Sequence, residues 1–243
     1  MQFHIEAIEV GNRLQNYIWM LIDQQTQHVV AIDPTQADLV LDYCTQHQLR
    51  LKQIWITHKH ADHIGGVSEL RHTTHATVYA PLAEQDHIVY ADHWLQDDDT
   101  FQFSDLNVDV MATAGHTHGH ICYFIDALDA LFCGDTLFAM GCGRLFEGTA
   151  TQMYRSLNRL AALPPRTQVY CTHEYTLNNA EFALSIEPEN MLLQQRHAKV
   201  QTLRQQGLNT LPSTIALELQ TNPFLRCQSA EEFGHLRRLK DLF

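Results

Sequence analysis

Short apolar runs, many of them alternating with polar residues, fill the first two thirds of the chain and predict β-strands. Turn-forming residues separate these runs, which is typical of a protein built from layered sheets. The predicted strands span residues 3–10, 16–23, 28–34, 53–58, 76–81, 101–103, 107–115, 121–126, 130–135 and 168–173.

Helical patterns lie between these strands and take over after about residue 173. Early helices are predicted over 36–48, 66–71 and 152–163, and later ones over 178–188 and 189–207. The last stretch begins with Ser229 and Glu232 in capping-box spacing and carries one apolar stripe, formed by Phe233, Leu236, Leu239 and Phe243. We therefore predict a larger α/β domain over 1–173 and a smaller helical domain over 174–243.

Composition narrows the class of protein. Apolar residues make up 45% of the 243 and charged residues 18%, which is an ordinary globular composition. A formal charge of −12 argues against nucleic acid as a partner. No leader pattern and no run of about 18 apolar residues occurs, so we expect a cytoplasmic protein that does not enter membranes. The six cysteines form no C-x-x-C pair, which favours reduced, buried thiols.

The segment Thr57–Gly66, THKHADHIGG, holds the densest chemistry in the chain. Three histidines and an aspartate follow an apolar run within seven residues. A metal ion offsets the cost of crowding such groups, and imidazole with carboxylate suits zinc, iron or manganese.

Three further strand ends carry comparable donors. The predicted strands over 107–115, 130–135 and 168–173 lead into or end at His116, Asp135 and His173, and His118 and His120 follow the first of these. Binding groups gather where strands end at one rim of a sheet. Two ions about 3.5–4 Å apart, sharing a carboxylate and a hydroxide, would make a hydrolytic site. The candidate ligands are His58, His60, Asp62, His63, His116, Asp135 and His173.

The phrases THKHADH, GHTHGH, GDTLF and THEYT, in this order, resemble the metallo-β-lactamase superfamily. GCGRLFEGTATQM, LPPRTQVYCTHEYTLNN, IEPEN, NPFLR and FGHLRRLKDLF resemble one branch of it, glyoxalase II, the hydroxyacylglutathione hydrolases. This resemblance implies a four-layer αββα sandwich followed by a helical domain, and hydrolysis of the thioester S-D-lactoylglutathione to D-lactate and glutathione.

The resemblance also implies roles for particular residues. One metal ion would be held by His58, His60 and His116 and the other by Asp62, His63 and His173, with Asp135 bridging; zinc is the first expectation, and iron or manganese are alternatives. Asp62 would also orient the attacking hydroxide. The glutathione moiety would be bound by Arg144, Phe146, Tyr175, Arg237 and Lys240.

The chain departs from the family pattern at four positions, one of which, Arg144 in place of a frequent Lys, keeps the positive charge. Lys59 and His118 replace the usual His and Pro, and neither position is a ligand in the family. Phe146 stands where the family often has Tyr, so it has no phenol hydroxyl to offer the substrate.

Some alternatives remain open from the residues alone. Spacing puts Arg237 and Lys240 on one helix face, which fits a solvated surface as well as a carboxylate site. Asp33 is either a partner that orients a ligand histidine or a turn cap. A persulfide dioxygenase on the same fold, which would consume oxygen, and a broader thioesterase are the competing functions. The expected partner is a small-molecule thioester, and no coiled-coil seam predicts more than a monomer.

Overall fold

The computed structural model describes residues 2–243 and divides them into two compact units. Unit 1 contains the chain up to Ala112 together with Gly119–Ala127, and unit 2 contains Thr113–His118 together with Leu128–Phe243. The boundary expected near residue 173 stays a prediction.

The main sheet of unit 1 has six strands in chain order. β1, β2 and β3 are antiparallel, and β3 to β6 are parallel. β2 is buried along its whole length, which explains its unbroken apolar run, whereas β1 at the edge alternates. The strands are β1 Phe3–Glu9, β2 Tyr17–Asp23, β3 His28–Ile32, β4 Arg50–Trp55, β5 Thr77–Pro81 and β6 His93–Leu95.

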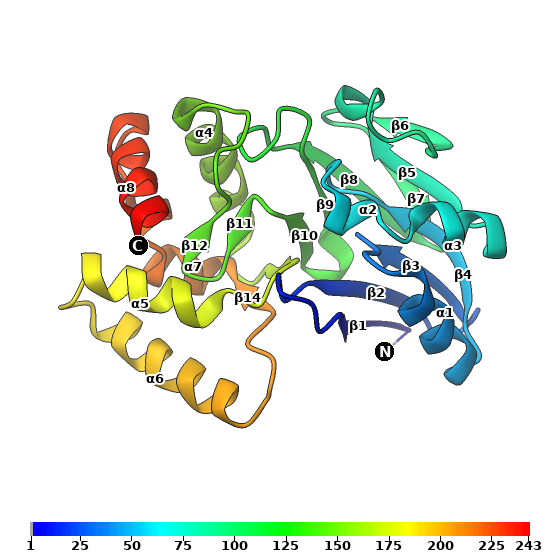
Figure 1. Ribbon diagram of the computed structural model, residues 1–243, viewed down its shortest axis with the longest axis horizontal. Helices are drawn as coiled ribbons and strands as arrows, with labels where there is room; N and C mark the ends of the chain where they lie inside the picture. Colours follow the sequence, from blue (N-terminus) through cyan, green and yellow to red (C-terminus); the bar gives the residue numbers. More distant parts are fainter. Residues whose placement is uncertain (1) are drawn as a thin grey trace. The chain divides into compact units, whose positions relative to one another are not determined.

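Two helices cover one face of this sheet, α1 (Ala37–Gln46) and α3 (Val67–Thr74) (Figure 1). The short helix α2 (Ala61–Ile64) and the 3-10 turn η1 (Leu82–Glu84) complete this unit. Gly66 precedes α3, where a Cβ would stand 2.7 Å from the Ala37 nitrogen and 2.8 Å from the Pro34 oxygen. Only glycine lets the two segments approach so closely, and this approach fixes the path of the chain just after the ligand-rich turn.

A second layer covers the other face of the sheet. It is an antiparallel set of three strands: β7 (Thr100–Phe103), β8 (Leu106–Ala112) and β9 (Ile121–Ile125). The Trp55 ring meets those of Phe101 and Tyr123 at centroid distances of 5.2 Å. Its neighbour Ile54 faces the helices instead, because successive residues of a strand point to opposite faces.

Unit 2 combines a few strands with most of the helices. β10 and β13 run parallel, β14 joins β13 antiparallel, and β11 with β12 forms a hairpin. Figure 1 shows α4 beside α8 and α5 beside α6. The strands are β10 Ala130–Gly134, β11 Leu137–Phe138, β12 Gly141–Cys142, β13 Gln168–Cys171 and β14 Ser213–Thr214; the helices are α4 Ala150–Ala161, α5 Thr176–Ile186, α6 Met191–Gln205, α7 Ile215–Thr221 and α8 Ala230–Leu242, with 3-10 turns η2 Asp126–Leu128 and η3 Pro223–Arg226.

Most elements match the sequence predictions, with informative exceptions. Thr149 and Gln152 form the capping box at the start of α4. On α8 the predicted stripe is only half right: Phe233 and Leu236 are buried, but Leu239 is 39% and Phe243 58% exposed. The short elements α2, β6, β11, β12, β14 and α7 were not predicted, because a few residues carry too little periodicity.

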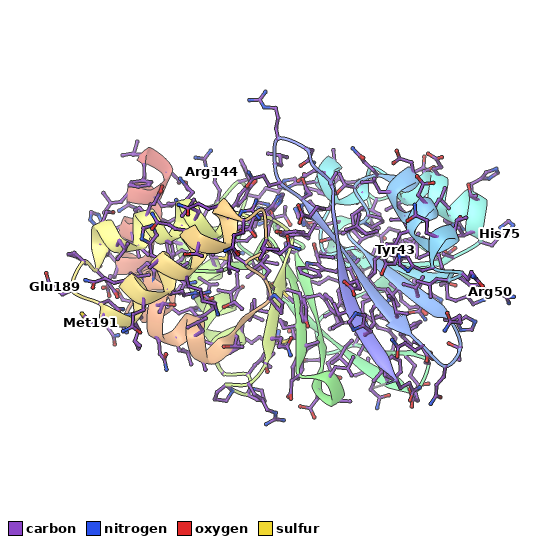
Figure 2. All side chains as sticks on the ribbon, turned by 90° about the horizontal axis from the view of Figure 1, so that it is seen from below. Tyr43, Arg50, His75, Arg144, Glu189 and Met191 are labelled. Atoms are coloured by element: carbon purple, nitrogen blue, oxygen red, sulfur yellow. The ribbon has the colours of Figure 1, made fainter. Side chains whose placement is uncertain are left out.

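Glu189 lies in the connection between α5 and α6, and Met191 begins α6, so the two lie close together where these helices are joined (Figure 2). None of the helices in residues 2–243 is both long and apolar enough to cross a membrane.

A buried ion pair holds α6 to α7 in unit 2. Arg196 Nη2 lies 2.6 Å from Glu218 Oε1, and both side chains are almost fully buried. Glu218 also accepts the Met140 N–H at 2.7 Å, so its charge is spread over several donors.

Replacing Arg196 with Met should lower the free energy of unfolding by about 3 kcal/mol, because Glu218 would stay buried without its cation. Urea unfolding measures this loss. Arg71→Met is the control, since the Arg71–Asp92 pair is largely exposed and water screens its charges, so that its removal should cost much less than the loss of the buried pair. Similar small losses for both variants would contradict the role given to the buried pair.

Candidate metal centre

The ligand-rich turn follows β4 directly. β4 ends at Trp55, and the chain then turns through His58 and His60 into α2, which carries Asp62 and His63. His58 and His63 are fully buried. His58 Nε2 and His60 Nδ1 face one another at 3.0 Å, close to the roughly 3.4 Å that separates two nitrogens on one tetrahedral zinc ion.

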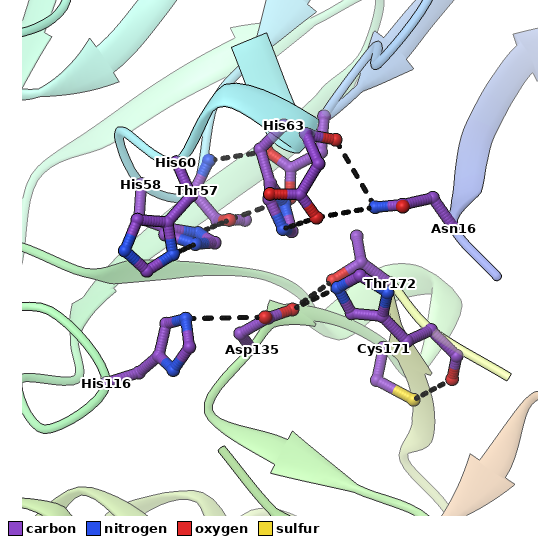
Figure 3. Close-up of polar contacts among 12 residues, drawn as sticks. Asn16, Thr57, His58, His60, His63, His116, Asp135, Cys171 and Thr172 are labelled. Carbon is purple, nitrogen blue, oxygen red and sulfur yellow. Dashed lines mark hydrogen bonds and ion pairs between the residues drawn. The ribbon is translucent and has the colours of Figure 1, made fainter. Parts of the chain in front are cut away.

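Asp33, at the end of β3, fixes the proton positions on two of these rings. Its Oδ2 accepts from His63 Nδ1 at 2.9 Å and from the Thr57 hydroxyl at 2.7 Å (Figure 3). The Thr57 hydroxyl has one proton, which it donates to Asp33. The hydroxyl oxygen must therefore accept a hydrogen bond from His58 Nδ1, 3.0 Å away. Both imidazoles therefore carry their proton on Nδ1 and keep a lone pair on Nε2. The orienting role of Asp33, left open by the sequence, is the one that its contacts support.

Asp62 is held by residues far away in the sequence. Asn16 Nδ2 donates to Asp62 Oδ2 at 3.0 Å, and the Thr35 hydroxyl donates to the Asp62 carbonyl at 2.7 Å. Asn16 is 2% exposed. These contacts fix the direction of the carboxylate before any ligand binds.

The three predicted ligands of unit 2 lie around a single carboxylate. Asp135 Oδ2 is 3.3 Å from His116 Nε2, and Asp135 Oδ1 is 3.2 Å from His173 Nε2 (Figure 3). The Thr172 hydroxyl donates to Oδ1 at 2.7 Å. His116 Nδ1 donates to the Arg144 carbonyl at 2.8 Å, so in the neutral ring its Nε2 also carries a lone pair.

These proton positions test whether the donors fit a metal ion. In unit 1, His63 Nε2 stands 3.4 Å from Asp62 Oδ2, and in unit 2 His116 Nε2 stands 3.3 Å from Asp135 Oδ2. A neutral ring in either pair would face the carboxylate oxygen with its lone pair, and a cation lying between the two atoms would turn that repulsion into attraction for both. Nitrogen and oxygen donors arranged in this way fit divalent metal ions.

Two aromatic rings predicted to contact the substrate flank the unit 2 ligands. Tyr175 stacks on His173 with a centroid distance of 4.7 Å and parallel planes. Phe146 meets the His116 ring edge-on at 5.2 Å and is 61% exposed. These rings therefore offer an apolar surface beside the donors.

The three predicted cations of unit 2 are held by neighbouring residues. Arg144 Nε and Arg237 Nη2 both contact Asp241 Oδ1, at 3.1 and 3.0 Å. Arg237 is 6% exposed and also donates to the Cys142 carbonyl at 2.8 Å, so it is less available than a surface cation. Lys240 donates to the side chain of Asn178, and its burial lowers the pKa of its ammonium group to about 8, with Arg237 adding to the effect.

Sequence reasoning missed three residues that touch this machinery. Asn16 holds Asp62, Asp241 joins Arg144 to Arg237, and the buried Glu84 contacts the ligand-rich turn at Lys59 and the loop at Gly119. No motif marks any of them, because each reaches its partner only through the fold.

Comparison with known proteins identifies the family in two steps. A model described as "Metallo-beta-lactamase superfamily" matches residues 36–173, more than half of the chain. ETHE1 from Myxococcus xanthus, a solved structure, is similar with a TM-score of 0.75 and 28% identity, covering 97% of this chain and 90% of that one. The fold and the donor set thus define a member of the metallo-β-lactamase superfamily.

The finer assignment rests on the whole length of the chain. A model described as "Hydroxyacylglutathione hydrolase C-terminus" matches residues 174–243. The hydroxyacylglutathione hydrolase of Aeromonas salmonicida is 46% identical over 98% of this chain and 99% of its own, and that of Methylococcus capsulatus is 41% identical over the same shares. The chain belongs to the hydroxyacylglutathione hydrolase family.

The family, the fold class and the enzyme class predicted from the sequence are therefore confirmed, and the oxidoreductase alternative is not favoured. The individual ligand and substrate assignments stay predictions.

Replacing Asp33 with Asn should weaken metal binding about 10–100-fold, because one amide oxygen cannot serve both the Thr57 N–H, which Oδ1 accepts, and the His63 ring and Thr57 hydroxyl, which Oδ2 accepts. Asp33 has φ 49°, a left-handed conformation that Asn tolerates, so the backbone need not change. Competition with a chromogenic chelator measures the affinity.

Asp23→Asn is the control. Asp23 is an equally buried carboxylate of unit 1, but it bonds to Gln25, Thr26 and Ser104, away from the ligands. This variant should lose stability and keep its metal affinity. Equal metal affinity in both variants would show that Asp33 does not orient the ligands.

Proposed function

We propose that this protein hydrolyses S-D-lactoylglutathione to D-lactate and glutathione at a centre of two divalent metal ions. The observation that carries the metal part of this proposal is Asp135, whose two oxygens each face the Nε2 of a different histidine. A carboxylate placed in this way is suited to bridge two ions. Membership of the hydroxyacylglutathione hydrolase family supports the substrate.

We assign the ligands as the family resemblance implies. His58, His60 and His116 would hold the first ion and Asp62, His63 and His173 the second, with Asp135 shared. Zinc suits this mixture of imidazole and carboxylate, and iron or manganese would also bind. When bound, the ions supply a water of lowered pKa and polarise the thioester carbonyl.

Asp62 is the residue assigned to orient the attacking water. Asn16 and Thr35 hold it in one direction, so little reorganisation is needed as charge develops. The leaving thiolate has a conjugate acid with a pKa of about 8.5, so it departs without a dedicated general acid. Hydrolysis then breaks the bond between carbonyl carbon and sulfur and yields a carboxylate and a thiol.

We assign the binding of glutathione to Arg144, Phe146, Tyr175, Arg237 and Lys240, with residues 174–243 as the substrate-binding domain. Arg144, Arg237 and Lys240 place positive charge in a protein of net charge −12, where the carboxylates of glutathione need partners. Phe146 offers an exposed apolar face in place of a phenol. The chain is proposed to act as a monomer in the cytoplasm, where its six buried cysteines, none of them in a disulfide in residues 2–243, stay reduced.

Metal-loaded protein should hydrolyse S-D-lactoylglutathione with a kcat/KM at least tenfold above that for the D-lactoyl thioester of N-acetylcysteamine, which lacks the glutathione carboxylates. Steady-state kinetics with both thioesters measures the ratio. Equal kcat/KM values would contradict the proposed glutathione site and indicate a general thioesterase. No turnover of either thioester by metal-loaded protein would overturn the proposed function.

The KM for S-D-lactoylglutathione should rise as the pH passes about 8. The lowered pKa means that Lys240 loses its proton near this pH, two units below an ordinary lysine, and with it the attraction to a substrate carboxylate. Lys240→Arg keeps its charge, so its KM should stay flat to about pH 9.5. Parallel KM profiles in the two proteins would show that Lys240 does not bind the substrate.

A further inference from the structure

Glu84 is a buried acid next to the proposed ligands of unit 1, and the proposed mechanism gives it no role. It ends η1, just after β5, and is 2% exposed. Its Oε2 accepts the backbone N–H of Lys59 at 2.5 Å, and its Oε1 accepts the backbone N–H of Gly119 at 3.2 Å. One carboxylate therefore joins two loops that lie 60 residues apart in the sequence.

Both amides belong to histidine-bearing turns. Lys59 lies between His58 and His60, and Gly119 directly precedes His120. The His120 ring is fully buried and stacks on His58 at a centroid distance of 4.8 Å and an interplanar angle of 26°. The Gly119 loop thus contacts the turn that carries His58 and His60 in two ways, through the stacked rings of His120 and His58 and through Glu84.

Residue 119 has to be glycine for this arrangement to form. A Cβ there would stand 2.4 Å from Glu84 Cγ and 3.0 Å from Ala83 Cβ. Such a contact would push the middle of the Glu84 side chain away, and the carboxylate with it. The glycine and the acid therefore depend on one another.

Burying a carboxylate is costly, and hydrogen bonds from backbone amides offset that cost. The same charge holds each amide in place more strongly than a neutral acceptor would. Because Glu84 uses the backbone N–H of residue 59 and not its side chain, this contact requires no particular side chain there and excludes only proline.

We propose that Glu84 is a positioning residue for the metal centre: it fixes the backbone of the turn that carries His58 and His60, and it ties this turn to the Gly119 loop. This inference rests on the metal site of the proposed function. In this proposal Glu84 acts through the Lys59 and Gly119 amides and is not assigned as a ligand.

Glu84→Gln tests the proposal, because an amide has one acceptor oxygen and would turn its NH2 group toward the other N–H. We expect about a 10–100-fold loss of zinc affinity in chelator competition, and a changed visible absorption spectrum of the cobalt(II)-loaded protein. Gly119→Ala should produce the same two changes by displacing Glu84. The double variant should lose no more affinity than the weaker-binding single variant, since both changes break one contact.

Glu218→Gln is the matched control, since Glu218 is fully buried and accepts the Met140 N–H but contacts no proposed ligand. It should lower the thermal midpoint of the metal-free protein and leave zinc affinity and the cobalt spectrum unchanged. If Glu84→Gln fails to fold, Gly119→Ala decides alone.

Wild-type zinc affinity and an unchanged cobalt spectrum in the folded Glu84 and Gly119 variants would overturn the proposal. Additive losses in the double variant would do the same. The readout is metal binding, so wild-type protein that binds zinc without hydrolysing the thioester would refute the proposed function and not the role of Glu84. Wild-type protein that binds no zinc would refute both.

Discussion

The position of one proton on the candidate ligands His58, His63 and His116 is the constraint on which the proposed metal centre depends. An imidazole binds a metal ion only through a nitrogen that carries a lone pair, and the hydrogen bond at the other nitrogen decides which one that is. In unit 1, Asp33 makes this choice for His63 directly and for His58 through Thr57. In unit 2, the Arg144 carbonyl makes it for His116. The outer groups therefore decide the chemistry that the ligands can perform.

The ligand-rich turn is also held by segments distant in the sequence. Asn16, just before β2, reaches Asp62, and Glu84, at the end of η1, reaches the Lys59 amide. Such contacts cost conformational entropy during folding. They also preorganise the candidate donors, which would then need little movement when ions bind. The buried aromatic layer around Trp55 provides the stiff support that this geometry requires.

In unit 2 a single residue, Arg144, contacts both a candidate ligand and another charged group. The Arg144 carbonyl orients His116, while its guanidinium group pairs with Asp241 on α8. Asp241 also holds Arg237, so a single carboxylate keeps two cations at a fixed spacing. A substrate carboxylate would then meet cations that are already ordered, which lowers the entropic cost of binding.

The sequence alone determined most of the longer elements and the family, and it marked the candidate donors. Period-two apolar runs located most strands, the Thr149–Gln152 capping box located α4, and donors placed just after apolar runs marked the ligand candidates. These features are local, so neighbouring residues are enough to reveal them. Only the tertiary structure decided the rest: that Asp33 orients histidines, that Asn16 and Glu84 hold the ligand turns, and that Arg237 is buried against Asp241. Those contacts join residues on separate elements. A hydrogen bond between residues far apart in the sequence produces no repeating pattern along the chain, so it cannot be predicted from neighbouring residues.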